Sequence, residues 1–130
     1  MSKTRVLVVD DRADVAASLA SFIEAANDSQ VVGTATGGHE AVRKAIELRP
    51  DIVLMDFSMQ DMDGVAAAEL IRTELPGTEV VILSVYAPED HAERARRAGV
   101  RTWLSKSAPL DRLLDEVRRV SQQRDPRTNH

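Results

Sequence analysis

Short apolar runs alternate with segments of helical periodicity along nearly the whole sequence, and this alternation constrains the fold more than any other feature. The runs are rich in β-branched side chains, as strands buried on both faces are. We expect strands at residues 5–9, 30–36, 52–55, 79–83 and 102–105. Strands that alternate with helices pair in parallel, and the helices then cover both faces of the sheet. The sequence therefore predicts an α/β protein with a doubly wound, five-stranded parallel sheet.

The intervening segments predict helices at residues 13–26, 39–49, 64–75, 88–98 and 109–123. Apolar residues recur there at helical spacing, with Ile46 assigned to the inner face of the second helix and Leu110 to that of the last. The fourth helix is expected to be weak. Its inner face consists of Ala92, Ala95 and Ala98, and small side chains bury little apolar area.

The chain has 130 residues, which fits one domain over residues 1–123 followed by a polar tail at 124–130 that we expect to be disordered. It has no cysteines, which excludes disulfides, thiolate metal sites and cysteine catalysis. No signal peptide or membrane helix is indicated, so we predict a cytoplasmic protein without membrane contact. The net charge of −4 argues against direct nucleic-acid binding.

Polar residues follow four of the five predicted strands where each strand ends. Asp10 and Asp11 follow the first, Asp56 the third, Ser84 the fourth, and Ser105-Lys106 the fifth. In doubly wound sheets ligands bind beyond the carboxyl ends of the strands, near the switch point in strand order. We therefore expect carboxylates, a hydroxyl and an ammonium group to converge at one edge of the sheet.

Such a constellation suits phosphoryl transfer. Clustered carboxylates repel one another unless a cation is present, and Mg²⁺ binds through one or two carboxylates while keeping waters for phosphate. An ionised carboxylate can attack phosphorus to give an aspartyl phosphate. Lys106 would add a positive point charge. Each residue alone also has an ordinary structural interpretation, as a turn former, a helix cap or a solubilising lysine.

The sequence resembles the receiver domains of bacterial two-component response regulators, from about Lys3 to about Gln122. The resemblance rests on motifs at the ends of the predicted strands. These are Val8-Val9-Asp10-Asp11, Leu54-Met55-Asp56 with Met59 and Met62-Asp63-Gly64, Ile82-Leu83-Ser84, and Trp103-Leu104-Ser105-Lys106. It implies a flavodoxin-like sheet with strand order 2-1-3-4-5, and the segment from Ser105 to Leu110 is loosely similar to NarL-type regulators.

The resemblance also implies a role for each site residue. Asp56 would be the phosphoacceptor, and Lys106 would pair first with it and then with the phosphate. Mg²⁺ would be bound by the side chains of Asp11 and Asp56 and by the backbone carbonyl of Ser58, with Asp10 acting mainly through water.

Signalling would then follow from a conformational switch. Ser84 would be the switch hydroxyl and Trp103 the switch aromatic residue, together repacking the surface from residue 88 to 114. The resemblance implies a histidine kinase or phosphotransfer protein as the donor, and an output domain or partner protein as the receiver of the signal. A homodimer through the C-terminal helices is also implied. The chain would be a regulatory module and not an enzyme.

The sequence departs from the family pattern around the site. Gln60 and Ser107 stand where proline is common, Val85 replaces a small residue, and Tyr86 lies at a position that tunes dephosphorylation. Trp103 is larger than the usual tyrosine or phenylalanine. We expect a competent site with altered kinetics, a looser loop after the acceptor and narrower access for the phosphodonor.

Two alternatives remain open. A pseudo-receiver would fold alike but signal only through protein contacts, without phosphorylation. A phosphatase of the same layout would turn over an aspartyl phosphate, and the segment from Asp61 to Val65 matches the DxDx(T/V) pattern of haloacid-dehalogenase-type phosphatases. That pattern must directly follow a strand, whereas here residues 57–60 intervene.

Overall fold

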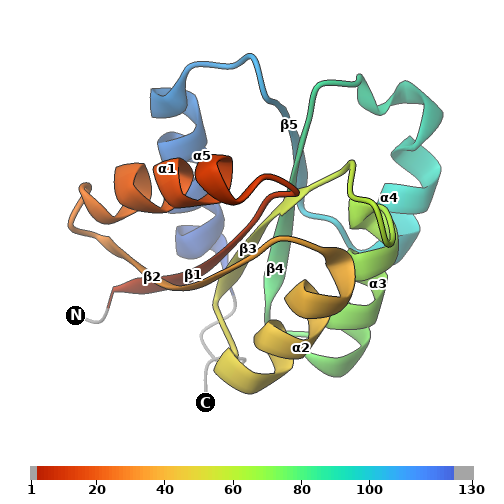
Figure 1. The fold of residues 1–130 in the computed structure, drawn as a ribbon, viewed down its shortest axis with the longest axis horizontal. Coiled ribbons are helices and arrows are strands. Elements are labelled where there is room, and N and C mark those ends of the chain that lie inside the picture. Colours follow the sequence, from red (N-terminus) through yellow and green to blue (C-terminus); the bar gives the residue numbers. More distant parts are fainter. Residues whose placement is uncertain (1–2, 125–130) are drawn as a thin grey trace.

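A computed structural model describes residues 3–124, which form a five-stranded parallel sheet between two layers of helices (Figure 1). The strands are β1 (Thr4–Val9), β2 (Ser29–Ala35), β3 (Ile52–Asp56), β4 (Glu79–Ser84) and β5 (Thr102–Ser105). Their order in the sheet is β2-β1-β3-β4-β5, and every neighbouring pair is parallel. The predicted fold class and strand order are confirmed.

The helices divide between the two faces of the sheet. One face is covered by α1 (Ala13–Glu24) and α5 (Leu110–Gln123), as Figure 1 shows. The other is covered by α2 (Gly38–Leu48), α3 (Gly64–Glu74) and α4 (Ala92–Ala98), with a single 3₁₀ turn, η1 (Pro88–Asp90), before α4. Within residues 3–124, no helix combines the length and the apolar character that crossing a membrane requires.

Successive strand residues feed two separate cores, one on each side of the sheet. In β1, Val6 and Val8 pack toward α1 and α5, whereas Leu7 and Val9 pack toward α2 and α3, and all four are essentially inaccessible to water. Burying each such side chain stabilises the fold by about 1.5–3 kcal/mol. The continuous apolar runs in the sequence therefore reflect a sheet that is covered on both faces.

Two strands extend one residue further than the apolar pattern indicates, because backbone pairing does not require an apolar side chain. Asp56 pairs with Leu83 in the sheet, and Ser84 pairs with Ser105. The predicted acceptor and switch hydroxyl are thus held by the sheet itself, and Phe57 N–H continues the ladder to the carbonyl of Leu83 at 3.0 Å.

Three predicted inner-face residues prove to be exposed. Ile46 is 42% exposed because α2 is buried through Ala41 and Ala45, which leaves Ile46 at the rim of the helix. Leu110 is 48% exposed because it lies in the first turn of α5, at the mouth of a cavity. Ala92 is exposed because the predicted helix at 88–98 is two pieces, and the shorter α4 buries only Ala95 and Ala98.

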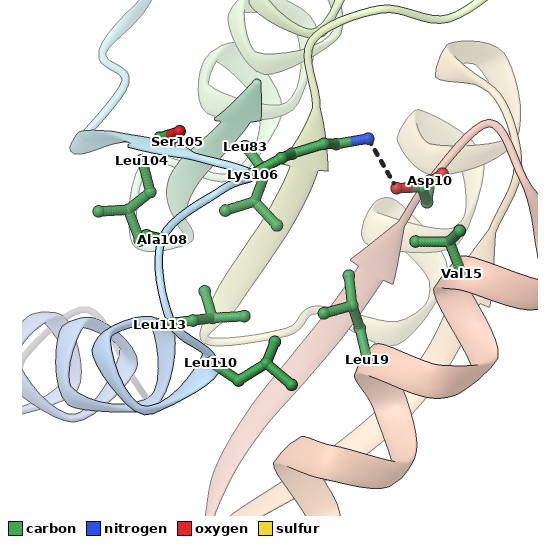
Figure 2. A pocket seen from close by; sticks show the side chains of 10 residues that line it. All are labelled: Asp10, Val15, Leu19, Leu83, Leu104, Ser105, Lys106, Ala108, Leu110 and Leu113. Atoms are coloured by element: carbon green, nitrogen blue, oxygen red, sulfur yellow. Dashed lines mark hydrogen bonds and ion pairs between the residues drawn. The ribbon is translucent and has the colours of Figure 1, made fainter. Parts of the chain in front are cut away.

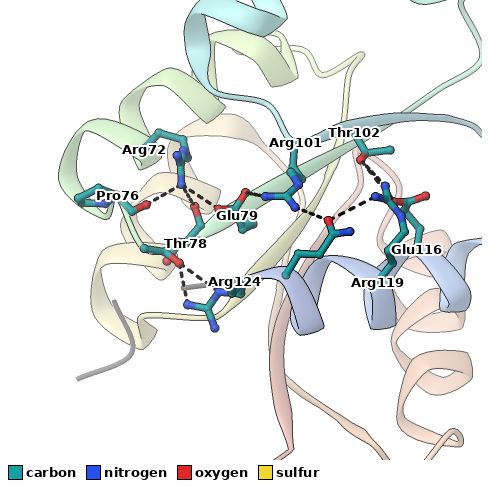
Figure 3. Close-up of polar contacts among 11 residues, drawn as sticks. Arg72, Pro76, Thr78, Glu79, Arg101, Thr102, Glu116, Arg119 and Arg124 are labelled. Atoms are coloured by element: carbon teal, nitrogen blue, oxygen red, sulfur yellow. Dashed lines mark hydrogen bonds and ion pairs between the residues drawn. The ribbon is translucent and has the colours of Figure 1, made fainter. Parts of the chain in front are cut away.

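A network of ion pairs and hydrogen bonds lies at the amino-terminal ends of the strands, opposite the predicted site (Figure 3). Glu79, the first residue of β4, pairs with Arg72 at 3.6 Å and with Arg101 at 3.7 Å. Arg124 follows α5, pairs with Asp51 at 2.8 Å and donates hydrogen bonds to a backbone carbonyl in the α3–β4 turn. Of the tail expected at 124–130, only Arg124 lies within the described residues.

Candidate functional site

The carboxyl ends of four strands bring the predicted site residues to one edge of the sheet. Asp10 follows β1, Asp56 ends β3, Ser84 ends β4 and Lys106 follows β5. Three of these polar side chains belong to buried residues, with exposed fractions of 2% for Asp10, 4% for Asp56 and 2% for Ser84. Polar groups are buried only where they have partners, so this edge is a constructed polar site within an apolar sheet.

Lys106 joins the two buried carboxylates. Its Nζ lies 3.0 Å from Asp10 Oδ2 and 3.1 Å from Asp56 Oδ1, and Figure 2 shows the side chain reaching across from β5 toward β1. Burial lowers the pKa of Lys106, but the hydrogen bonds to Asp10 and Asp56 outweigh this and the net pKa shift is upward. The ammonium therefore remains charged at neutral pH and neutralises part of the carboxylate charge.

Backbone amides orient both carboxylates. Asp11 N–H donates to Asp56 Oδ2 at 3.2 Å and Ser58 N–H donates to Asp56 Oδ1 at 3.3 Å. Arg12 N–H donates to Asp10 Oδ1 at 2.9 Å. Such bonds fix the direction of a carboxylate.

The donor set fits a hard divalent cation of the Mg²⁺ type. Asp10 and Asp56 are two buried oxygen donors that share one partner, whereas Asp11 is exposed and only its backbone touches Asp56. Across residues 3–124, no three histidine, aspartate or glutamate side chains are gathered closely enough to hold a metal by themselves. Mg²⁺ needs only one or two carboxylates because it retains several waters.

An apolar cavity of about 110 Å³ lies beside the ion pair, between the start of α1 and the start of α5 (Figure 2). Leu19, Leu83 and Leu104 line its floor together with Leu113, and Lys106 and Asp10 lie at its polar end. The apolar walls lower the local dielectric on one side of the ion pair and so strengthen its electrostatics.

The predicted switch residues are linked through the β4–α4 loop. Ser84 Oγ accepts a hydrogen bond from Tyr86 N–H at 2.9 Å, and Trp103 Nε1–H donates to the Tyr86 carbonyl at 3.1 Å. The side chains of Val85 and Tyr86 are 71% and 60% exposed. Both residues directly follow Ser84 at the end of β4, and both are departures from the family pattern.

The loop after Asp56 is attached to two helix starts, a feature that the sequence analysis missed. Asp61 accepts hydrogen bonds from Gly38 N–H and His39 N–H, both at 2.9 Å, and so caps α2, while Asp63 caps α3 by accepting from Ala66 N–H at 2.8 Å. The hydrogen bonds from His39 and Gly38 hold the pKa of Asp61 far below its usual range. A glycine pair at a helix start without its own cap was the available signal.

Comparison with known proteins agrees with the geometry. Residues 6–118 match the family model described as the response regulator receiver domain. The response regulator protein VraR of Staphylococcus aureus is 38% identical over 117 residues, which cover 90% of this chain and 56% of that protein. The chain thus spans little more than half the length of this relative.

Two solved structures share the fold over nearly all of the chain. The signal receiver domain of the putative response regulator NarL from Mycobacterium tuberculosis has a TM-score of 0.89 and 25% identity, covering 95% of this chain and 100% of that one. A CheX–CheY–BeF3–Mg²⁺ complex from Borrelia burgdorferi has a TM-score of 0.83 and 26% identity, covering 92% of this chain and 90% of that one. Taken with the site geometry, these matches show that the chain belongs to the receiver domains of two-component response regulators.

Proposed function

We propose that this receiver domain accepts a phosphoryl group on Asp56 from a phosphohistidine of a histidine kinase or phosphotransfer protein. One observation carries the proposal. Lys106 Nζ lies within 3.1 Å of Asp56 Oδ1 and 3.0 Å of Asp10 Oδ2, in a site where both carboxylates are buried. A buried carboxylate that shares an ammonium and faces the open edge of the sheet is suited to receive a phosphoryl group and to have its charge balanced.

In the proposed phosphoryl transfer, only one bond forms to the protein, and the other residues position and neutralise the reacting groups. An Asp56 oxygen forms a bond to phosphorus while the phosphorus–nitrogen bond of phosphohistidine breaks, and its electron pair returns to the imidazole nitrogen. The amides of Asp11 and Ser58, which hydrogen-bond the Asp56 oxygens, aim the carboxylate. Lys106 is close enough to follow the developing charge onto the phosphoryl oxygens.

Mg²⁺ is the cofactor that we propose for this site, held by the side chains of Asp11 and Asp56 and the carbonyl of Ser58, with Asp10 acting mainly through water. When bound, it supplies charge neutralisation to the phosphoryl oxygens. The two buried carboxylates support this proposal, as does the Mg²⁺ in the complex of the related CheY.

The phosphorylated state would be read at the surface from residue 88 to 114. Ser84 would leave Tyr86 N–H and hydrogen-bond a phosphoryl oxygen, and Trp103 would follow as the switch aromatic residue. A relative such as VraR is longer than this chain, so an output domain or a partner protein is the proposed reader. Homodimerisation through the C-terminal helices stays a prediction.

Intact mass after incubation with acetyl phosphate and Mg²⁺ tests this function. We expect one phosphoryl adduct on the wild type, and none on Asp56→Asn or without Mg²⁺. A folded wild type that gains no adduct from acetyl phosphate or from a phosphorylated kinase would contradict the proposal and favour a pseudo-receiver. Sustained turnover of small phosphoesters would instead favour a phosphatase.

A further inference from the structure

Three rings from separate elements meet behind the acceptor strand. The His91 ring is nearly parallel to the Trp103 indole, at an interplanar angle of 8° and a centroid distance of 6.1 Å. Phe57, which directly follows Asp56, lies 4.6 Å from His91 and 5.1 Å from Trp103 between ring centroids. Aromatic groups at these separations attract one another beyond their area of contact.

His91 also forms the junction between η1 and α4. Its N–H donates to the Pro88 carbonyl at 2.9 Å, and its carbonyl accepts from Ala95 N–H at 2.9 Å as the first hydrogen bond of α4. One residue therefore holds the backbone on both sides of the junction while its side chain contacts Trp103. A displacement of the His91 ring is transmitted directly to the first turn of α4.

A continuous series of contacts connects this junction with the switch hydroxyl. Ser84 Oγ is bonded to Tyr86 N–H, the Tyr86 carbonyl is bonded to Trp103 Nε1–H, and the Trp103 ring stacks on His91. Tyr86 thus uses its N–H to bond the Ser84 hydroxyl and its carbonyl to bond the Trp103 indole. If Ser84 moves, the N–H of Tyr86 loses its partner, and the Tyr86 carbonyl that accepts from Trp103 is held less firmly.

The remaining attachments of α4 are weak. It buries only Ala95 and Ala98, and its ion pair from Arg94 to Asp63, at 3.0 Å, involves side chains that are 50% and 32% exposed. Exposed ion pairs contribute little to stability, and alanines bury little area. The aromatic contact at His91 is therefore a large part of what fixes the start of this helix.

We propose that His91 is a positioning residue that transmits the position of Trp103 to the first turn of α4. The inference rests on the proposed phosphorylation of Asp56 and names the residue that carries its effect to the output surface. In the resting state the stacked rings hold α4 in place. When Trp103 rotates, His91 keeps its contact with Phe57 but loses the parallel stacking on Trp103, and the start of α4 loosens.

The test uses His91→Ala, His91→Phe as the variant that keeps an aromatic ring, and Glu47→Ala as a control at an exposed position of α2. Trp103 is the single tryptophan, so fluorescence reports on it alone. Three quantities are measured: emission and acrylamide quenching of Trp103, amide hydrogen exchange over residues 92–98 with and without acetyl phosphate and Mg²⁺, and phosphoryl uptake by intact mass.

At rest, we expect His91→Ala to expose Trp103 to quencher and to speed amide exchange in α4 by about 3- to 10-fold, as loss of an aromatic pair implies. Its phosphoryl uptake should equal that of the wild type, while the phosphorylation-dependent change in exchange shrinks. His91→Phe should restore both properties, and Glu47→Ala should behave as the wild type.

The inference would be overturned if resting His91→Ala showed the Trp103 fluorescence and the α4 exchange rates of the wild type. It would also be overturned if the phosphorylation-dependent change in exchange kept its wild-type size in that variant, or if His91→Phe restored neither property. Failure of the wild type to take up a phosphoryl group is a separate result. It would contradict the proposed function, and the resting measurements would still decide whether His91 positions α4.

Discussion

Replacing Lys106 with methionine tests the electrostatics of the site most sharply. The substitution keeps most of the side-chain volume but removes the ammonium that lies within 3.1 Å of both buried carboxylates. Removing one partner of a fully buried ion pair costs about 3–5 kcal/mol, because the other charge remains buried without compensation. The Lys106 side chain is 29% exposed, so water can partly hydrate the carboxylates, and we expect a loss of about 2–3 kcal/mol.

The assay is equilibrium unfolding in urea without Mg²⁺, for the wild type, Lys106→Met, Asp56→Asn and the double variant. Asp56→Asn should recover most of the loss in the Lys106→Met background, because one buried charge is then neutral. Mg²⁺ should also raise the stability of Lys106→Met by compensating the carboxylates. A loss below about 0.5 kcal/mol, or purely additive effects of the two substitutions, would refute this reasoning.

Three further results are expected. Gly64→Ala should lower the free energy of unfolding by about 2–3 kcal/mol and slow phosphoryl uptake, since a Cβ there would lie 2.5 Å from the backbone oxygen of Asp56. A variant that unfolds at the wild-type urea midpoint would contradict this. Asp61→Asn should be less stable than the wild type at neutral pH. Because folding lowers the pKa of Asp61, the stability that its carboxylate contributes is complete above about pH 4 and is lost as the pH falls further. A difference in unfolding free energy between the wild type and Asp61→Asn that stays constant down to pH 3 would be contrary evidence. Val85→Ala should gain a phosphoryl group from acetyl phosphate severalfold faster with stability unchanged, because Val85 is 71% exposed and directly follows Ser84 at the end of β4. An unchanged rate, in mass spectra recorded over time, would show that Val85 does not limit access.

The sequence was sufficient to predict the sheet and the approach of Lys106 to Asp56. Apolar runs with β-branched residues identify strands that are covered on both faces, and parallel strands must present their carboxyl ends at one edge. Asp10, Asp56 and Lys106 could therefore be placed together before any distance was known. The pattern of apolar residues does not indicate where a strand ends when its last residue is polar, as at Asp56 and Ser84.

The features that the sequence did not predict depend on contacts between distant segments. Asp61 was considered only within a phosphatase-like pattern, yet it caps α2, and nothing local to residue 61 indicates that partner. The stacking of His91 on Trp103 has no local signal in the sequence, because it requires the η1–α4 junction and β5 to meet. The interruption between η1 and α4 likewise reflects this packing, whereas helix periodicity alone predicted one continuous segment.

We propose that Asp56, and neither Asp10 nor Asp11, carries the phosphoryl group, and the position of that group can be read directly. Borohydride reduction of the protein treated with acetyl phosphate and Mg²⁺ converts an aspartyl phosphate into homoserine, and peptide mass spectrometry then locates the modified residue. Our account predicts homoserine at position 56 alone, and none in protein that was not exposed to the donor. Homoserine at position 10 or 11, or a phosphoryl adduct that borohydride leaves unchanged, would contradict it.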